Sequence, residues 1–152
     1  DILKKGEGFF VVNDAHTFVS PELKRFPEHC LGSTWEAKTI KELEIYEDYA
    51  NLKFYKNSTC ALFAPHLMPT LLQMTSLEKV VMVGCCTDIC IMNFFDEMNL
   101  DILIEVPLNA VETYHIPEIH DREEKNKQAF LWMESNGIRL VREKKEGKYD
   151  EN

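Results

Sequence analysis

The sequence predicts an α/β protein in which a doubly wound, mostly parallel sheet carries helices on both faces. Short apolar runs alternate along the chain with longer segments whose apolar residues recur every three or four positions, as in successive βαβ units. With 152 residues and 45% hydrophobic content, the chain can bury one sizeable core but rarely two. We therefore expect three layers, α/β/α, in a Rossmann-like arrangement that forms a single domain over residues 1–152.

Each expected element has its own signal in the sequence. The strand candidates are short, apolar and β-rich, whereas the helix candidates have apolar residues at helical spacing. Gly137 follows Ser135 and Asn136 and is expected to cap the last helix, because glycine readily adopts the left-handed conformation that ends many helices. In chain order, we expect a strand at 9–13, a helix at 35–49, a strand at 52–56, a helix at 65–75, a strand at 79–85, a helix at 88–98, a strand at 101–106, a helix at 121–135 and a strand at 138–142.

The charge and the cysteine content limit the class of partner. A formal net charge of −9 argues against nucleic acid or an anionic membrane as the main partner and favours a small neutral or cationic ligand. No stretch approaches the length of a membrane span, and the first residues lack a signal-peptide layout, so we expect a cytosolic protein. Five cysteines, three of them around one turn, do not resemble a disulfide framework, and we expect reduced thiols.

The most informative segment surrounds Cys90, where an apolar strand runs through a sharp turn into the helix expected at 88–98. Backbone N–H groups at a helix start have no partner within the helix, and the helix dipole is positive there. Both effects lower a thiol's pKa and can hold an oxyanion, so this position suits a cysteine nucleophile. In the alternative, Cys85, Cys86 and Cys90 are small buried hydrophobic residues.

A second group of candidate residues follows the first expected strand. Asp14 and His16 are two positions apart at the strand end, so both side chains point to one side of the carboxyl edge, where open α/β sheets bind ligands. Glu22 and His29 can fold back from the following loop and complete a set of carboxylates and imidazoles that suits zinc, manganese or iron. In the alternative, both acids are ordinary surface residues and the histidines cap loops.

Lys56 is the third candidate, because it ends an apolar strand and so lies at the same carboxyl edge. Near a thiolate, a lysine supplies positive charge that keeps the nucleophile ionised and stabilises negative charge in the transition state. The alternative is a solvated lysine that caps a strand.

Matches to one enzyme family occur in order along nearly the whole chain. They are Asp14-Ala15-His16, Glu22, Phe26-Pro27-Glu28-His29, Gly32-Ser33-Thr34, Lys56 with Ala61 and Phe63, and Gly84-Cys85-Cys86-Thr87-Asp88-Ile89-Cys90. Together they resemble the nicotinamidase and pyrazinamidase branch of the isochorismatase-like cysteine hydrolases. The resemblance implies that Cys90 is the nucleophile and Lys56 its cationic partner. It also implies that one divalent metal ion, zinc in the first place and otherwise manganese or iron, is held by Asp14, His16, Glu22 and His29.

The same resemblance implies the remaining parts of the site. A cis peptide between Cys85 and Cys86 would aim the backbone N–H groups of Cys86 and Cys90 at the substrate oxygen, and Phe26 would stack on a pyridine ring. The implied reaction hydrolyses nicotinamide, and by extension pyrazinamide, to the acid and ammonia through a thioester on Cys90, a step of NAD salvage. The substrate is a small amide, and a homo-oligomer is compatible with the sequence.

One part of the family pattern is absent from these residues. The family's general base is an aspartate on its first strand, in a segment resembling V-D-x-Q-x-D-F, and Asp1 does not match it. We therefore expect an upstream strand and most of a crossover helix, on the order of 30 residues, and expect residues 1–152 alone to be inactive.

The sequence also allows other interpretations. The chain could hydrolyse another amide or a vinyl ether as a different isochorismatase-like hydrolase, or bind a pyridine metabolite without chemistry. A redox-sensing thiol protein is a further alternative, although adjacent cysteines on a strand are expected to point to opposite faces. The histidines at 66, 115 and 120 have no motif around them, and we expect surface or capping roles.

Overall fold

The computed structural model describes residues 8–50, 52–98 and 101–142, which fold into two compact units. Of these residues, the first unit comprises 8–50, 52–75 and 96–98, and the second comprises 76–95 and 101–142. Among the described residues, no helix has both the length and the apolar character that crossing a membrane requires.

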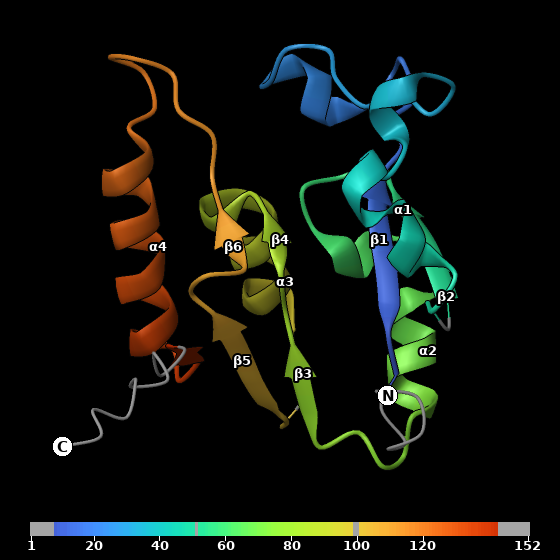
Figure 1. Ribbon diagram of the computed structural model, residues 1–152, viewed down its shortest axis with the longest axis vertical. Helices are drawn as coiled ribbons and strands as arrows, with labels where there is room; N and C mark the ends of the chain where they lie inside the picture. Colours follow the sequence, from blue (N-terminus) through green and yellow to red (C-terminus); the bar gives the residue numbers. More distant parts are fainter. Residues whose placement is uncertain (1–7, 51, 99–100, 143–152) are drawn as a thin grey trace, which may run out of the picture. The chain divides into compact units, whose positions relative to one another are not determined.

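The first unit is built around two parallel strands, β1 (Phe10–Asp14) and β2 (Leu52–Lys56), which lie side by side in Figure 1. Their register pairs Phe10 with Leu52 and ends by pairing Asp14 with Lys56. The two candidate site residues thus stand next to each other at the carboxyl edge of the pair. The other elements of this unit are η2 (Pro21–Lys24), η3 (Trp35–Ala37), α1 (Lys41–Glu47), η4 (Ala61–Phe63) and α2 (Leu67–Gln73).

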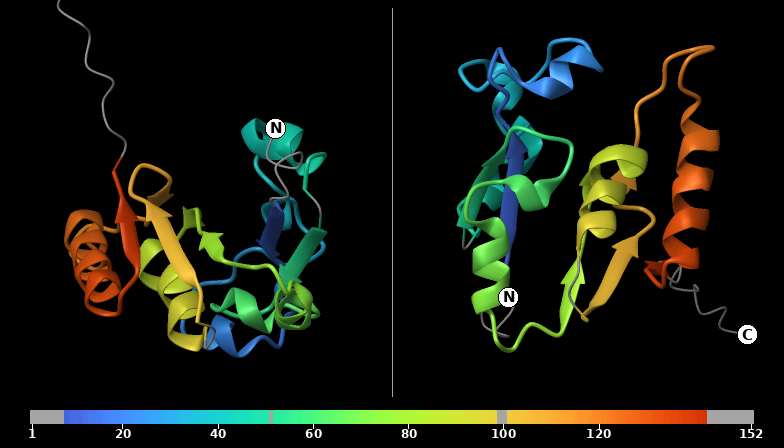
Figure 2. Two further views of the ribbon diagram at one scale, coloured as in Figure 1. Left: turned by 90° about the horizontal axis from the view of Figure 1, so that it is seen from below. Right: turned by 180° about the vertical axis from the view of Figure 1, so that it is seen from behind.

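The second unit contains two sets of parallel strands, in the orders β3–β5–β7 and β4–β6. Helix α4 contacts both β7 and the π-helical turn η5, and it lies beside the strands of this unit in Figure 2. Val106 of β5 and Met133 of α4 are fully buried and mark the core. The elements are β3 (Lys79–Val81), β4 (Gly84–Cys85), η5 (Thr87–Ile91), most of α3 (Met92–Glu97), β5 (Leu103–Pro107), β6 (Val111–Glu112), α4 (Arg122–Ser135) and β7 (Arg139–Val141).

All pairings between these named strands are parallel, which confirms the predicted α/β class. The expected helix at 35–49 is divided into η3 and α1, because Lys38 and Ile40 adopt extended conformations. The Thr39 hydroxyl between them donates to Glu47 and accepts from the Asn13 amide at 2.9 Å, which fixes the break. The strand expected at 79–85 is divided into β3 and β4, and β4 pairs with the short strand β6, which the sequence does not predict.

The end of α4 follows the prediction for Gly137, which has a φ of +79°. Its N–H donates to the carbonyl of Glu134 at 3.1 Å, and the N–H of Ile138 donates to Met133 at 3.0 Å. These two bonds form a Schellman motif, in which the left-handed residue costs least as glycine. The predicted glycine cap is therefore confirmed.

Candidate active site and metal centre

The loop after β1 returns to the end of that strand, and this return brings the two candidate histidines together. The N–H of His16 donates to the carbonyl of Cys30 at 2.9 Å, and the N–H of Gly32 donates to the carbonyl of His16 at 3.0 Å. These bonds form a parallel bridge between His16 and Leu31. As a result, the rings of His16 and His29 lie edge to face with centroids 4.7 Å apart.

Three of the four candidate metal ligands lie in one group, namely His16, Glu22 and His29. Each offers one possible ligand atom, and these three atoms lie within 4.8 Å of one another. Oε1 of Glu22 is 3.7 Å from Nε2 of His16 and 3.5 Å from Nε2 of His29. The 3-10 helix η2, which begins with Pro21, holds the glutamate in the returning loop.

Hydrogen bonds orient the imidazoles of His16 and His29 so that the Nε2 atom of each faces the carboxylate of Glu22. Nδ1 of His16 lies 3.2 Å from Oδ1 of Asn57, and Nδ1 of His29 lies 2.7 Å from the carbonyl oxygen of Pro27. The backbone N–H of Thr17 also donates to Oδ1 of Asn57 at 3.1 Å, which supports this orientation of the amide. Because both partners are acceptors, Nδ1 carries the hydrogen and Nε2 of a neutral ring offers its lone pair, as metal-bound histidines do.

Two buried atoms of this group have no hydrogen-bond partner among the described residues, Nε2 of His16 and Oε2 of Glu22. Buried polar atoms without partners are rare, and each one calls for an explanation such as an ion or a water. A divalent cation would satisfy both atoms, and two imidazoles with a carboxylate suit zinc, manganese or iron. The residues therefore fit a metal ion.

Lys56 and Asp14 lie directly beside this group. The Lys56 ammonium donates to Oδ1 of Asp14 and to the carbonyl of Ser58, the latter at 2.9 Å. The lysine side chain is 5% exposed, so it is not the solvated strand cap of the alternative interpretation. Asp14 is outside the three-residue group, but its Oδ1 is 3.4 Å from Nε2 of His16. Phe26 follows η2 with a partly exposed side chain, and its stacking role stays a prediction.

The cysteine turn lies in the second unit, between β4 and α3. The peptide between Cys85 and Cys86 is cis, as the resemblance implies, and Gly84 before it has a φ of +127°, which favours glycine. The carbonyl of Cys86 accepts from the N–H groups of Ile89 at 3.2 Å and Ile91 at 3.1 Å, so the helix begins with a π turn. Such turns often occur at functional sites.

The three thiols of this turn are not buried hydrophobic residues, because Cys85 is exposed and Cys86 and Cys90 are partly exposed. A hydrogen bond between the thiols of Cys85 and Cys86, followed by burial and by the charges of Cys85 and Cys90, raises the pKa of Cys86. This shift disfavours the thiolate form of Cys86.

The predicted site residues thus fall into two groups on separate units. Asp14, His16, Glu22, His29 and Lys56 come together in the first unit, and Cys86 and Cys90 share a turn of the second. The roles assigned to Cys90, Lys56 and the backbone N–H groups of Cys86 and Cys90 remain predictions.

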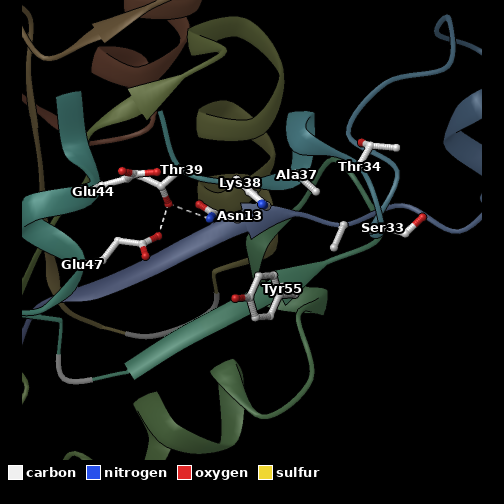
Figure 3. A pocket seen from close by; sticks show the side chains of 11 residues that line it. Asn13, Ser33, Thr34, Ala37, Lys38, Thr39, Glu44, Glu47 and Tyr55 are labelled. Atoms are coloured by element: carbon white, nitrogen blue, oxygen red, sulfur yellow. Dashed lines mark hydrogen bonds between the residues drawn. The ribbon is translucent and has the colours of Figure 1, made fainter. Parts of the chain in front are cut away.

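A polar pocket in the first unit contains none of the predicted site residues. Asn13 and Tyr55, which are register partners on β1 and β2, line it together with Lys38, Thr39 and Glu47 (Figure 3). Because successive side chains of a strand alternate between faces, Asn13 lies on the face of β1 opposite to Asp14. The pocket is therefore separate from the metal group.

Two parts of the site are absent from the sequence-based prediction. Asn57, which orients His16, is signalled only by its position after Lys56 at a strand end. His120 is 7% exposed and lies against Asp88, so the expected surface role is wrong for this residue. By contrast, His66 lies at the N-terminal end of α2, and His115 is exposed and accepts from the N–H of Arg122 at 3.3 Å, in line with the expected roles.

Comparison with known proteins connects these features to a class of α/β hydrolytic enzymes. Residues 4–137 match the isochorismatase domain. The chain therefore belongs to the isochorismatase-like hydrolase family. A comparison with curated proteins returned no match.

Solved structures share the fold at low sequence identity. A pyrazinamidase/nicotinamidase from Streptococcus mutans is 24% identical with a TM-score of 0.76, covering 92% of this chain and 78% of that one. An N-carbamoylsarcosine amidase from Thermoplasma acidophilum is 20% identical with a TM-score of 0.71, covering 96% and 79%. A pyrazinamidase from Pyrococcus horikoshii in complex with zinc is 19% identical with a TM-score of 0.71, covering 93% and 79%. These similarities confirm the predicted α/β fold.

Proposed function

We propose that this protein is a metal-dependent cysteine amidohydrolase that converts nicotinamide, and also pyrazinamide, to the corresponding acid and ammonia. The observation that carries the proposal is the group of His16, Glu22 and His29, with two buried atoms that lack hydrogen-bond partners, beside a buried lysine. A bound divalent ion would polarise and orient the ring nitrogen of a pyridine carboxamide. We assign Asp14 to the same ion, because its carboxylate adjoins His16.

In the proposed reaction, the Cys90 thiolate attacks the carboxamide carbon, and the carbon–nitrogen bond breaks as the nitrogen takes up a proton and leaves as ammonia. Water then hydrolyses the thioester, which releases the carboxylic acid and restores the thiol. Lys56 supplies positive charge to the thiolate, and the N–H groups of Cys86 and Cys90 hold the oxyanion. Phe26 stacks on the ring of the substrate.

The fold neighbours support two amide classes, since they include nicotinamidases and an N-carbamoylsarcosine amidase. The metal group favours the pyridine amides, because a ring nitrogen is a good ligand for the ions that imidazole and carboxylate residues hold. The alternative of an inactive metabolite-binding relative predicts similar affinity for nicotinamide and nicotinate without turnover.

The test is ammonia release by the full-length protein, loaded with zinc, manganese or iron in turn, from nicotinamide, pyrazinamide and N-carbamoylsarcosine. We expect release from the two pyridine-type amides and its loss after chelation. Release from N-carbamoylsarcosine alone would assign the chain to the other amide class. Binding of nicotinamide without ammonia from any substrate would support the inactive relative.

A further inference from the structure

Asp88 occupies the middle of the turn that carries the proposed nucleophile, two residues after Cys86 and two before Cys90. Its Oδ2 lies 2.8 Å from Nε2 of His120, and its Oδ1 accepts from the Thr113 hydroxyl at 2.5 Å. The side chains of Asp88 and His120 are 13% and 8% exposed. The carboxylate is thus held through both oxygens in a largely buried position.

The His120 ring is itself fixed on several sides. Nδ1 lies 3.0 Å from the carbonyl oxygen of Tyr114, and the Tyr114 ring stacks on the imidazole with centroids 3.9 Å apart and planes at 20°. The backbone of His120 exchanges two hydrogen bonds with Ile116, of 3.0 and 2.8 Å, which close the turn before α4. His120 is therefore a rigid partner for Asp88.

Thr113 connects the end of β6 to the cysteine turn. Its hydroxyl donates to Oδ1 of Asp88, in the middle of the turn, at 2.5 Å. Residues after β6 and residues before α4 therefore converge on η5, although they are 25 and 32 positions away from Asp88 in the sequence.

We propose that Asp88, His120 and Thr113 form a positioning network that holds the turn from Cys86 to Cys90 in the geometry that presents the Cys90 thiol and the Cys86 N–H to the substrate. The inference rests on the proposed function only in taking Cys90 as the nucleophile. The three residues act through the turn and are not catalytic residues. A shift of about 1 Å in a reacting group can cost about 100-fold in rate. Loosening this turn should therefore lower kcat strongly and change the affinity for substrate only slightly.

The test uses full-length protein with Thr113→Val and His120→Gln as the disrupting variants. Two variants serve as controls. Thr113→Ser keeps the hydroxyl, and His115→Gln makes the same histidine change at an exposed position of the segment between β6 and α4. For each protein, we would measure kcat and KM for nicotinamide, the rate at which iodoacetamide alkylates Cys90 by mass spectrometry, and thermal unfolding by circular dichroism.

We expect Thr113→Val and His120→Gln to lower kcat about 10- to 100-fold with little change in KM, and to slow alkylation of Cys90. Thr113→Ser and His115→Gln should retain both rates. Folded disrupting variants with unchanged kcat and alkylation would overturn the proposal, as would a loss of activity that only follows the loss of folded protein. If His120→Gln does not fold, the comparison of Thr113→Val with Thr113→Ser tests the proposal by itself. If the wild-type protein releases no ammonia, the proposed function fails, and the alkylation rates alone support or overturn the network.

Discussion

The ammonium group of Lys56 donates a hydrogen bond to the carboxylate of Asp14 where strands β1 and β2 end side by side. The lysine is 5% exposed and the aspartate 26% exposed, so the pair is only partly screened by water. The same Oδ1 atom lies 3.4 Å from Nε2 of His16. The proposed cationic partner of Cys90 and the proposed metal ligand His16 therefore share one carboxylate.

Because Lys56 and His16 share the Asp14 carboxylate, we expect Lys56 and Asp14 to be energetically coupled in protein freed of metal by a chelator. Lys56→Met should lower the free energy of unfolding by about 2 kcal/mol, because removal of one partner leaves the other charge partly buried and unpaired. Asp14→Asn should also destabilise, but the double variant should lose less than the sum. Urea unfolding of the four proteins measures the coupling, and additive losses would contradict it. Lys53→Met, on the exposed part of β2, is the matched control and should have a smaller effect.

Metal binding should stabilise the protein through His29. Zinc at 100 times its dissociation constant stabilises a folded protein by about 2.7 kcal/mol, so we expect a clear rise in melting temperature on titration. His29→Ala should reduce that rise strongly, and it should fold because the side chain is 37% exposed. His115→Ala changes an exposed histidine outside the metal group and should keep the full response. An equal rise in both variants would exclude His29 as a ligand.

Acid should weaken a contact beside the polar pocket of Figure 3. The hydrogen bond from Lys53, and then that from Thr39, lowers the pKa of Glu47. A carboxyl group whose folded pKa lies below its unfolded value stabilises the protein above the unfolded pKa, and this stabilisation is lost as the pH falls through the folded pKa. Glu47→Gln should therefore destabilise at neutral pH, and this destabilisation should shrink as the pH falls below 4.5, the ordinary pKa of a glutamate. Urea unfolding of the wild type and the variant across this pH range measures the change, which should be smaller in a Lys53→Met background.

The sequence predicts those elements whose signals are local. Strand β2 has the predicted bounds, since its apolar run ends at a lysine and polar residues follow. The cap at Gly137 needs only a few neighbouring residues. The grouping of His16, Glu22 and His29 follows from the position of Asp14 and His16 at a strand end and from a loop long enough to return.

Features that depend on distant partners are not predictable in this way. Strand β6 has two residues and exists through its pairing with β4, 27 positions earlier. The burial of His120 depends on Asp88, and the role of Asn57 depends on a ring 41 positions away. In each case the residue type allows many environments, and only the folded chain selects one.

Cys90→Ala tests the proposed nucleophile directly. The variant should lose at least about a thousandfold in ammonia release, because removal of a covalent nucleophile leaves only binding and oxyanion stabilisation. Its metal content should stay unchanged, because the candidate ligands lie on the other unit. Ammonia assays with elemental analysis check both statements. Cys85→Ser changes the exposed neighbouring thiol and is the control that should retain activity. Activity in Cys90→Ala would shift the assignment to Cys86.

Asn57 should control metal affinity although it does not face the ion itself. Its Oδ1 accepts from Nδ1 of His16 and from the N–H of Thr17, and these bonds leave Nε2 of His16 directed at Glu22. Loss of such a partner typically costs 10- to 100-fold in metal affinity. Asn57→Leu should therefore weaken zinc binding by about that factor, as measured by competition with a chromophoric chelator. Asn57→Asp keeps an acceptor at the same position and should bind zinc at least as tightly as the wild type. If both variants lost affinity equally, the amide would act through packing and not through the orientation of His16.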